Sequence, residues 1–372
     1  MNFDFSNEQK MLKDQARKFL QDQCSSTVVR QVLEGEMEYA RHVWQEMAEM
    51  GWQGTCIPEA YGGAGLGYLE LCVLAEEVGR SLAPIPFSSS VYLVSEALLS
   101  AGSEAQKSHW LPKLSSGETI GVLALAEGAG APAESRLQCR FSAGRLTGKK
   151  MPVLDGPLAD VAIVVAKDDD TGGASLVLVG AADPSVQTEP LTTVDPTRPQ
   201  AIMTFHNTPA ECLGVPGRGW ALLTELFNKA AVLLAFEQIG GADAALQMAR
   251  DYALGRYAFG RQIGSFQAIK HKLADCYIKN ELARSNTYFG AWALSTNARE
   301  LPLAAATARV AATRAFDFAA KENIQTHGGM GYTWEFDCHL YYRRAKLLAL
   351  SLGSALTWKN RLVDQLEQLS AA

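Results

Sequence analysis

The sequence predicts an α+β fold in which a small antiparallel β domain lies between two helical regions. Apolar residues recur with helical periodicity in the first and last parts of the chain. Between them, short apolar runs such as VAIVVAK and SLVLVG are separated by clusters of Pro, Gly, Asp and Thr, which is typical of short strands joined by turns. A chain of 372 residues is long enough for two or three domains. We therefore expect domains at 1–116, 117–214 and 215–372.

Composition and charge indicate a folded protein of a reducing, aqueous compartment. Hydrophobic residues make up 48% of the chain and charged residues 20%, as in ordinary globular proteins. The net charge of −6, without a long basic run, argues against a nucleic-acid partner. No signal-peptide pattern and no uninterrupted apolar run of about 18 residues is present, so no membrane span is expected. The seven scattered cysteines form no CxxC pair, which favours free thiols in the cytoplasm over disulfides or a metal site.

The first helical region is divided by a glycine-rich break. Ser6, followed by Glu8 and Gln9, has the pattern of a helix start. Four glycines within 62–67 interrupt helical structure, and the run YLELCVLAEEVGR then restarts a helix that ends before Pro84.

The β region contains an acidic run that resembles a metal site but has a simpler interpretation. Asp168–Asp170 lies between two apolar runs in the segment KDDDTGG. Asp and Gly at such a place are typical of a tight connection between strands. We therefore expect a solvated hairpin turn and no metal site.

A long helical segment organises the last domain. Its apolar face recurs at positions spaced by seven, four and three residues: Leu234, Gly241, Ala245, Met248 and Tyr252. No proline interrupts 217–300, and three glycines in 255–264 predict a hinge between two helices. Glu237 stands among apolar residues of the first helix, so we expect it to be buried.

Two clusters in this domain have the chemistry of a dinucleotide site. The first contains Arg256, Phe259 and Gln267, and the second contains Gln325, Gly328 and Gly329. A pyrophosphate needs cations or helix N-termini, and glycines let the backbone approach a ligand closely. No G-x-G-x-x-G follows a strand, so a Rossmann site is not indicated. Each cluster alone also fits an exposed arginine or a simple turn.

Together the clusters, RYAFGRQIGSFQ and QTHGGMGY, resemble the two flavin-binding motifs of the acyl-CoA dehydrogenases. The block PEAYGGAGLG…EEVGR is also similar to that family, and the resemblance covers nearly the whole chain. It implies an N-terminal helical domain, a middle antiparallel β-barrel or sandwich and a C-terminal four-helix bundle.

The resemblance also implies FAD as the cofactor. Arg256, with Phe259 and Gln267 in its motif, would hold the pyrophosphate, and Gln325 with Gly328–Gly329 the adenosine side. In the family these motifs reach a flavin bound in a neighbouring subunit, which implies an oligomer.

Two segments of the β region depart from the family pattern. Ala126–Ala131 stands where the family has a Thr-Glu-Pro…Gly-Ser-Asp segment that hydrogen-bonds flavin and thioester. Pro152–Asp155 stands where relatives often have Trp-Ile-Thr-Asn against the isoalloxazine. Either backbone N–H groups replace the missing side chains, or a partner subunit supplies a complete flavin pocket.

The catalytic base is the least direct assignment. Dehydrogenation removes a weakly acidic Cα proton, for which a carboxylate in a dry pocket is suited. Most relatives place this Glu at the position of Leu352, and another branch near Ala230. Glu237 lies two helical turns beyond Ala230 on nearly the same face, beside Gly240–Gly241, where a ligand could approach. We take Glu237 as the candidate base; the alternative is an ion pair with a nearby Arg or Lys, or an interface position.

The expected function is α,β-dehydrogenation of an acyl-CoA thioester, with electrons passing to an electron-transfer flavoprotein. The helix around Glu237 and the ending TWEFDCHLYYRRAK resemble members that act on bulky, steroid-like CoA thioesters. This suggests a role in lipid metabolism or steroid degradation, as a homo-oligomer or as half of an α2β2 heterotetramer. The alternatives are a non-catalytic partner subunit and a flavin monooxygenase of the same fold.

Overall fold

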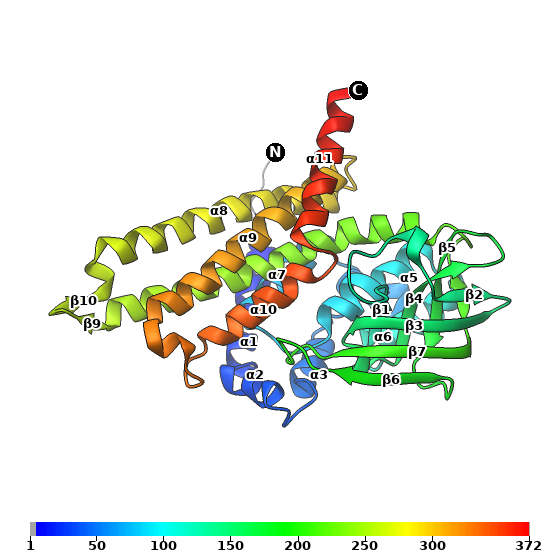
Figure 1. Ribbon diagram of the computed structural model, residues 1–372, viewed down its shortest axis with the longest axis horizontal. Helices are drawn as coiled ribbons and strands as arrows, with labels where there is room; N and C mark the ends of the chain where they lie inside the picture. Colours follow the sequence, from blue (N-terminus) through cyan, green and yellow to red (C-terminus); the bar gives the residue numbers. More distant parts are fainter. Residues whose placement is uncertain (1–4, 372) are drawn as a thin grey trace. The chain divides into compact units, whose positions relative to one another are not determined.

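The chain follows the expected order of helices, β sheet and helices (Figure 1). The computed structural model describes residues 5–371. The N-terminal helices are α1 (Asn7–Gln23), α2 (Ser26–Leu33), α3 (Arg41–Glu49), α4 (Tyr68–Arg80), the π-helix η2 (Ser88–Ser95), α5 (Glu96–Ala101) and α6 (Glu104–Ser115).

Local signals in the N-terminal sequence explain where these helices begin and end. Ser6 caps α1, because its Oγ accepts from Gln9 N at 3.2 Å while Ser6 N donates to Gln9 Oε1 at 2.9 Å. Gly62 and Gly65 have positive φ in the glycine-rich break, a conformation that glycine adopts without steric cost. The predicted helix start at Ser6 and the helical restart at Tyr68 are both confirmed.

The strands between residues 121 and 213 form one large sheet. Its strands are β1 (Gly121–Ala124), β2 (Arg140–Ser142), β3 (Arg145–Leu154), β4 (Val161–Asp168), β5 (Ala174–Gly180), β6 (Val186–Leu191), β7 (Gln200–Pro209) and β8 (Glu211–Leu213). The order is β6-β7-β3-β2-β4-β5-β8, with β1 also paired to β4. The β1–β4 and β2–β4 pairs are parallel and the others antiparallel, so the sheet is mixed. One face packs a core that includes Phe141, Val164 and Phe205.

The acidic run lies in the turn between the antiparallel strands β4 and β5, as expected. Asp168 Oδ1 accepts from Asp170 N at 3.0 Å and Thr171 N at 3.1 Å, and Asp168 Oδ2 accepts from Ser175 Oγ at 2.6 Å. Asp168 is therefore buried within the turn that it stabilises, and is not solvated as predicted.

The C-terminal region is helical, with one short hairpin. Its elements are α7 (Gly219–Gly255), β9 (Tyr257–Ala258), β10 (Arg261–Gln262), α8 (Gln267–Ser295), α9 (Leu301–His327), α10 (Cys338–Leu350) and α11 (Ala355–Ala371). The predicted hinge is thus confirmed, and α9 packs against α8, α10 and α11.

The helix α7 is unusually long and apolar. Among the helices of residues 5–371, only α7 has the length and composition to cross a membrane, and 61% of its most apolar window is buried inside the protein. A central helix in a folded core has the same properties.

Contacts between residues divide the chain into two compact units, and the segments of these units alternate along the sequence. The first unit contains residues 1–30, 68–83 and 231–372, and the second contains 31–67 and 84–230. The helix α7 begins in the second unit and continues into the first. The expected boundaries at 116 and 214 follow changes in secondary structure, and they stay predictions.

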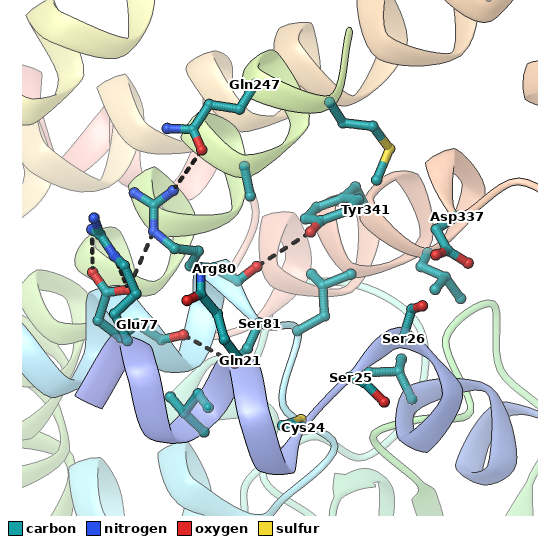
Figure 2. Close-up of a pocket in the computed structure, with 17 residues that line it drawn as sticks. Gln21, Cys24, Ser25, Ser26, Glu77, Arg80, Ser81, Gln247, Asp337 and Tyr341 are labelled. Carbon is teal, nitrogen blue, oxygen red and sulfur yellow. Dashed lines mark hydrogen bonds and ion pairs between the residues drawn. The ribbon is translucent and has the colours of Figure 1, made fainter. Parts of the chain in front are cut away.

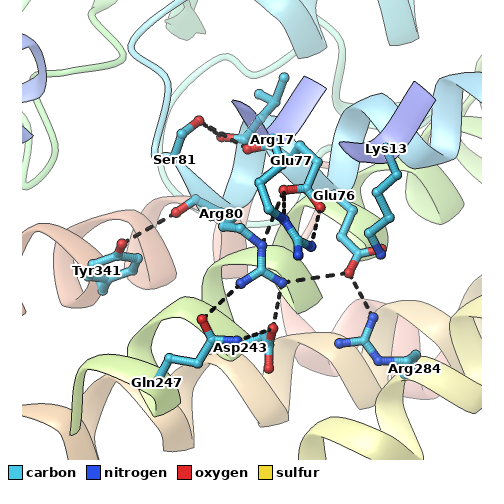
Figure 3. Close-up of polar contacts among 11 residues, drawn as sticks. Lys13, Arg17, Glu76, Glu77, Arg80, Ser81, Asp243, Gln247, Arg284 and Tyr341 are labelled. Atoms are coloured by element: carbon cyan, nitrogen blue, oxygen red, sulfur yellow. Dashed lines mark hydrogen bonds and ion pairs between the residues drawn. The ribbon is translucent and has the colours of Figure 1, made fainter. Parts of the chain in front are cut away.

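Ion pairs buried on α4 connect the helices of the first unit (Figure 3). Glu76 lies 2.6 Å from Lys13 Nζ and 2.7 Å from Arg284 Nη1, and Glu77 lies 2.8 Å from Arg17 Nη2. Burial alone would raise the pKa of Glu76, but attraction and hydrogen bonds from Lys13 and Arg284 outweigh it and lower that pKa. The pairs of Glu76 therefore join α1, α4 and α8 through a charged carboxylate.

Candidate functional site

The first predicted cluster lies at the hairpin between α7 and α8. Arg256 follows directly after α7, with its N–H donating to Tyr252 O at 2.8 Å and its carbonyl accepting from Ile263 N at 2.8 Å. Phe259 forms the tip of the hairpin with φ +51° and is 96% exposed. Gln267 is the first residue of α8. All three side chains are exposed on the first unit.

The second cluster lies at the end of α9. Gln325 is exposed in its last turn, and Gly328 ends the helix with φ +61°. A Cβ built on Gly328 or Gly329 meets no atom within 4 Å. By contrast, a Cβ on Gly331 would lie 2.5 Å from Ile324 O. Gly331 therefore serves packing, while the backbone at 328–329 is open to a ligand.

Two aromatic residues bring the clusters together. The Tyr252 ring, one helical turn before Arg256, stacks on the His327 ring with centroids 4.0 Å apart. Tyr252 Oη also donates to Met330 Sδ at 3.4 Å. Burial lowers the pKa of His327, whose Nδ1 lies 2.8 Å from Asn323 O, so the ring is neutral at neutral pH. His327 thus shapes the glycine turn.

These residues define what we call the cofactor surface: Arg256, Phe259, Gln267, Gln325, Gly328 and Gly329. It combines an exposed guanidinium, two exposed amides, an exposed aromatic ring and open glycine backbone. Guanidinium and backbone N–H groups bind diphosphate, and an aromatic ring offers apolar area to a base. The groups present therefore fit the diphosphate and adenosine portions of FAD.

Glu237 lies in the interior of the first unit, as its sequence context predicted. It is fully buried, and Arg344 Nη1 is 4.0 Å from its Oε1. Arg344 is also buried and donates to Leu82 O at 3.1 Å. Arg344 thus supplies the partner that the ion-pair alternative for Glu237 required.

The glycines near Glu237 serve helix packing, which corrects the expectation that a ligand approaches there. A Cβ on Gly240 would lie 1.9 Å from Glu76 O, and a Cβ on Gly79 would lie 1.8 Å from Glu237 O. A Cβ on Gly241 would lie 2.6 Å from the Phe316 ring. The backbones of α4 and α7 are thus in close contact, and no space for a ligand remains beside these glycines.

A buried arginine that sequence reasoning missed holds the turn after α10. Arg309 donates to the carbonyls of Leu348 and Ser351, the latter at 2.7 Å, and to Thr313 Oγ1 at 2.5 Å. Burial lowers the pKa of Arg309 to about 9, although Glu237 attracts its charge. The next residue after Ser351, Leu352, has φ +60°. The lone Arg in the run AAATARVAA was the available signal.

In the second unit, hydrogen bonds within the β region hold the segment that replaces the Thr-Glu-Pro motif. Glu127 accepts from Gln138 N at 2.7 Å, Cys139 N at 3.0 Å and Lys150 Nζ at 2.7 Å. Burial raises the pKa of Glu127, but the hydrogen bonds from Lys150 and the two N–H groups outweigh it and lower that pKa. A Cβ on Gly128 meets nothing within 4 Å, so the backbone of this loop remains accessible.

In the segment Pro152–Asp155, the carboxylate of Asp155 likewise points into the protein. Asp155 is fully buried with φ +56°, and its Oδ1 accepts from Arg198 Nε at 2.9 Å. Arg198 is buried as well and donates to Ser88 Oγ at 2.8 Å. Asp155 therefore stabilises the second unit and is not available to hydrogen-bond a flavin.

Comparison with known proteins identifies the family of the chain. The model of the acyl-CoA dehydrogenase N-terminal domain matches residues 6–118, and that of the C-terminal domain matches 217–364. Acyl-CoA dehydrogenase IpdE2 of Mycobacterium tuberculosis (strain ATCC 25618 / H37Rv) is 32% identical over 359 residues, which cover 96% of this chain and 97% of the relative.

Two solved structures of assemblies are also similar. A variant of the Tcur3481-Tcur3483 steroid ACAD has a TM-score of 0.89 and 32% identity, covering 98% of this chain and 99% of the other. The ChsE4-ChsE5 complex of Mycobacterium tuberculosis has a TM-score of 0.88 and 28% identity, covering 99% of each chain.

The fold and the matched family models define a flavin-dependent oxidoreductase. The chain belongs to the acyl-CoA dehydrogenase family, whose cofactor is FAD. The predicted family, fold, enzyme class and cofactor are thus confirmed.

Proposed function

We propose that this chain takes part in the FAD-dependent α,β-dehydrogenation of a bulky, ring-bearing acyl-CoA thioester, as half of a two-chain assembly. The observation that carries the proposal is the junction of the two clusters through Tyr252 and His327 into one exposed cofactor surface. The bulky substrate and the second chain are supported by similarity to a steroid ACAD and to a two-chain complex.

The residues of the cofactor surface have distinct roles in this proposal. Arg256 binds the diphosphate, Gln325 and the open backbone of Gly328–Gly329 hold the adenosine side, and Phe259 and Gln267 complete the contact. When bound, FAD supplies the acceptor for the hydride that leaves Cβ. Because these side chains are exposed on the outside of one unit, they suit a flavin whose ring lies in a neighbouring subunit.

Glu237 is the candidate for the group that takes the Cα proton. It is a carboxylate shielded from water, and in relatives the acid positions correspond here to Leu352 and Ala230, which cannot accept a proton. A route for the thioester to Glu237 requires the buried pair with Arg344 to open. Electrons would then pass to an electron-transfer flavoprotein, in the cytoplasm.

A second candidate function is that of a partner subunit whose chemistry lies on another chain. Two observations favour it: Glu237 is paired with Arg344 in the interior, and Glu127 is bound to Lys150 and to backbone N–H groups of its own domain. In that case the chain contributes its cofactor surface to a flavin site that the partner completes.

Reconstitution tests both proposals. The chain is purified alone and together with the product of any neighbouring gene of the same family, and flavin per chain is measured by absorbance. We expect little flavin alone, and about one flavin for every two chains in the mixture. Turnover is then measured on short, long and ring-bearing CoA thioesters with an artificial electron acceptor.

Ring-bearing esters are expected to give the highest kcat/KM. Full flavin occupancy of the chain alone would instead indicate a homo-oligomer. A mixture without flavin, or without activity on any ester, would contradict the dehydrogenase proposal. Assembling this chain with a base-deficient version of the second chain separates the two functions, because activity then persists only if Glu237 of this chain is the base.

A further inference from the structure

A cavity of about 410 Å³ lies within the first unit, between α1, α2, α4, α7 and α10 (Figure 2). Small-molecule sites in proteins have volumes of roughly 300–1,000 Å³. Among the described residues that line it are neither Glu237 nor any member of the cofactor surface. The cavity is therefore distinct from the machinery of the proposed reaction.

Part of the cavity wall is apolar. Its wall includes Leu20, Val29, Leu82 and Leu340, all less than 5% exposed over the whole residue, together with the more accessible Met248. These residues come from separate parts of the chain, so their side chains converge on one space. An apolar ligand body placed there would be removed from water on several sides.

The charged groups on the wall are already held in ion pairs. Arg17 and Arg80 both bind Glu77, at 2.8 Å and 3.2 Å, and Asp337 binds Arg30 at 2.7 Å. Arg80 also donates to Asp243, which adds a second carboxylate to its surroundings (Figure 3). A charged ligand would have to break one of these ion pairs or remain without an ion-pair partner. In either case the cost of removing its charge from water would not be offset by a new ion pair.

Uncharged polar groups surround the entrance. Gln21, Ser25 and Ser26 are exposed and line the cavity. Tyr341 Oη donates to Arg80 O at 3.3 Å, which leaves its oxygen able to accept a hydrogen bond. Burial raises the pKa of the Cys24 thiol to about 12, so this wall group is also neutral.

The cavity wall contains a residue in an unfavourable backbone conformation. Leu82 follows the end of α4 with φ +52°, where glycine is the usual residue. Its N–H donates to Gly79 O at 3.2 Å, and its carbonyl accepts from Arg344 Nη2 at 3.1 Å. These bonds hold the backbone of Leu82 in this conformation, with Leu82 in the cavity wall.

From these features we infer a binding site for a neutral small molecule with an apolar body and one hydroxyl or carbonyl end. The apolar body would contact Leu20, Leu82 and Leu340. The polar end would reach the uncharged groups at the entrance. The inference depends on the cavity itself and not on the proposed dehydrogenase function.

Three fluorinated probes of similar size test the inference: 4-fluorobenzyl alcohol, 4-fluorobenzoate and 4-fluorobenzylamine. Their binding to the purified full-length protein, with any partner chain present, is measured by ¹⁹F NMR titration. We expect the neutral alcohol to bind at least about tenfold more tightly than either charged probe. Excess FAD should leave this binding unchanged, because the cavity and the cofactor surface do not share residues.

Matched variants locate the binding. Ala244 lines the cavity on α7, whereas Ala221 is exposed on the same helix and does not line it, so Ala244→Phe fills the space and Ala221→Phe is the control. Ala244→Phe should weaken binding of the alcohol at least about tenfold, and Ala221→Phe should weaken it less than about twofold. Gln21→Trp, at an exposed position, narrows the entrance and serves if Ala244→Phe does not fold.

Equal binding by the cavity variants and the control would overturn the site. Tighter binding of benzoate or benzylamine would overturn its assignment to neutral ligands. Displacement of the alcohol by FAD would place the probe on the cofactor surface instead.

Discussion

Glu237 lies on α7 and Arg256 directly follows the end of that helix, yet their surroundings are opposite. Glu237 is fully buried, whereas Arg256 is exposed at the hairpin. Both environments could be predicted from the sequence, because apolar neighbours surround the first and a glycine-rich break surrounds the second. The partner of Glu237 could not, because Arg344 comes from a different helix and local spacing rules reach only about one turn.

Arg256→Gln should weaken flavin binding while leaving the fold intact. A charge-assisted hydrogen bond contributes about 1.5–3 kcal/mol, so we expect roughly 10- to 100-fold weaker retention of FAD. Flavin content of the assembled protein during dialysis measures this. Arg250→Gln is the control, because Arg250 is also exposed on α7 but forms an ion pair with its neighbour Asp251. Equal retention by both variants would remove Arg256 from the cofactor site.

Glu237→Gln separates a catalytic from a structural carboxylate. If Glu237 is the base, the variant keeps its flavin but no longer exchanges the substrate Cα proton with deuterated solvent. Arg344→Met breaks the same buried pair and should lower the free energy of unfolding by about 3–5 kcal/mol, while keeping the carboxylate and some exchange. Wild-type turnover in Glu237→Gln would exclude it as the base and leave the ion pair as its role.

At the scale of elements, the contact between α4 and α7 depends on glycine. Gly240→Ala forces a Cβ to 1.9 Å from Glu76 O, so we expect a loss of about 1–3 kcal/mol or more in unfolding free energy. Gly255→Ala, in the same helix, meets no atom within 4 Å and should gain up to about 1 kcal/mol. Urea unfolding monitored by circular dichroism compares the two. Similar stability of both variants would show that the helices are not in close contact at Gly240.

The helices and strands were more predictable than their pairing. Apolar runs predicted β4 and β5, but the parallel pairing of β1 and β2 with β4 joins residues from distant parts of the chain. The sequence predicts ordinary helix at the π-helix Ser88–Ser95, because side-chain periodicity barely distinguishes the two hydrogen-bond patterns. The hairpin β9–β10 has only two residues per strand, too few for an alternating pattern.

At the scale of the whole molecule, carboxylates from both units make stability depend on pH. Glu76, Glu127 and Asp317 all have a lowered pKa; burial opposes this, but bonds from cations and N–H groups outweigh it. A lowered folded pKa stabilises the protein above the unfolded value, and this contribution is lost as pH falls through the folded value.

The carboxylate contribution to the unfolding free energy should therefore be constant near neutral pH and fall below about pH 4.5, the ordinary value for Glu. The lowered pKa of the buried His327 adds a separate loss that begins as the pH falls below about 6.5. Urea titrations across this range measure it. Lys13→Met removes one partner of Glu76 and should raise the folded pKa of that carboxyl, so less unfolding free energy should be lost below about pH 4.5 than in the unaltered protein, whereas Lys18→Met, on the same helix, should leave this loss unchanged. An identical pH profile for the Lys13 variant would contradict the role of this pair.

The interleaving of the two units could not be read from the sequence. Composition separated helical from β segments, which is a property of each segment. Membership of a unit depends on which segments touch, so 68–83 belongs with 231–372 despite the long stretch between them. The cofactor surface was easier to predict, because each of its two clusters is contiguous in the chain. The Tyr252–His327 stack that brings the clusters together could not be predicted.

The reactivity of the seven cysteines can report where the structure opens locally. All are free; Cys56 and Cys212 are partly accessible, and the other five are buried. A thiol reagent will therefore modify the two accessible sulfurs quickly and the five interior ones only when local structure separates. Mass spectrometry of the modified peptides over time would then report, without any introduced label, which segments loosen first.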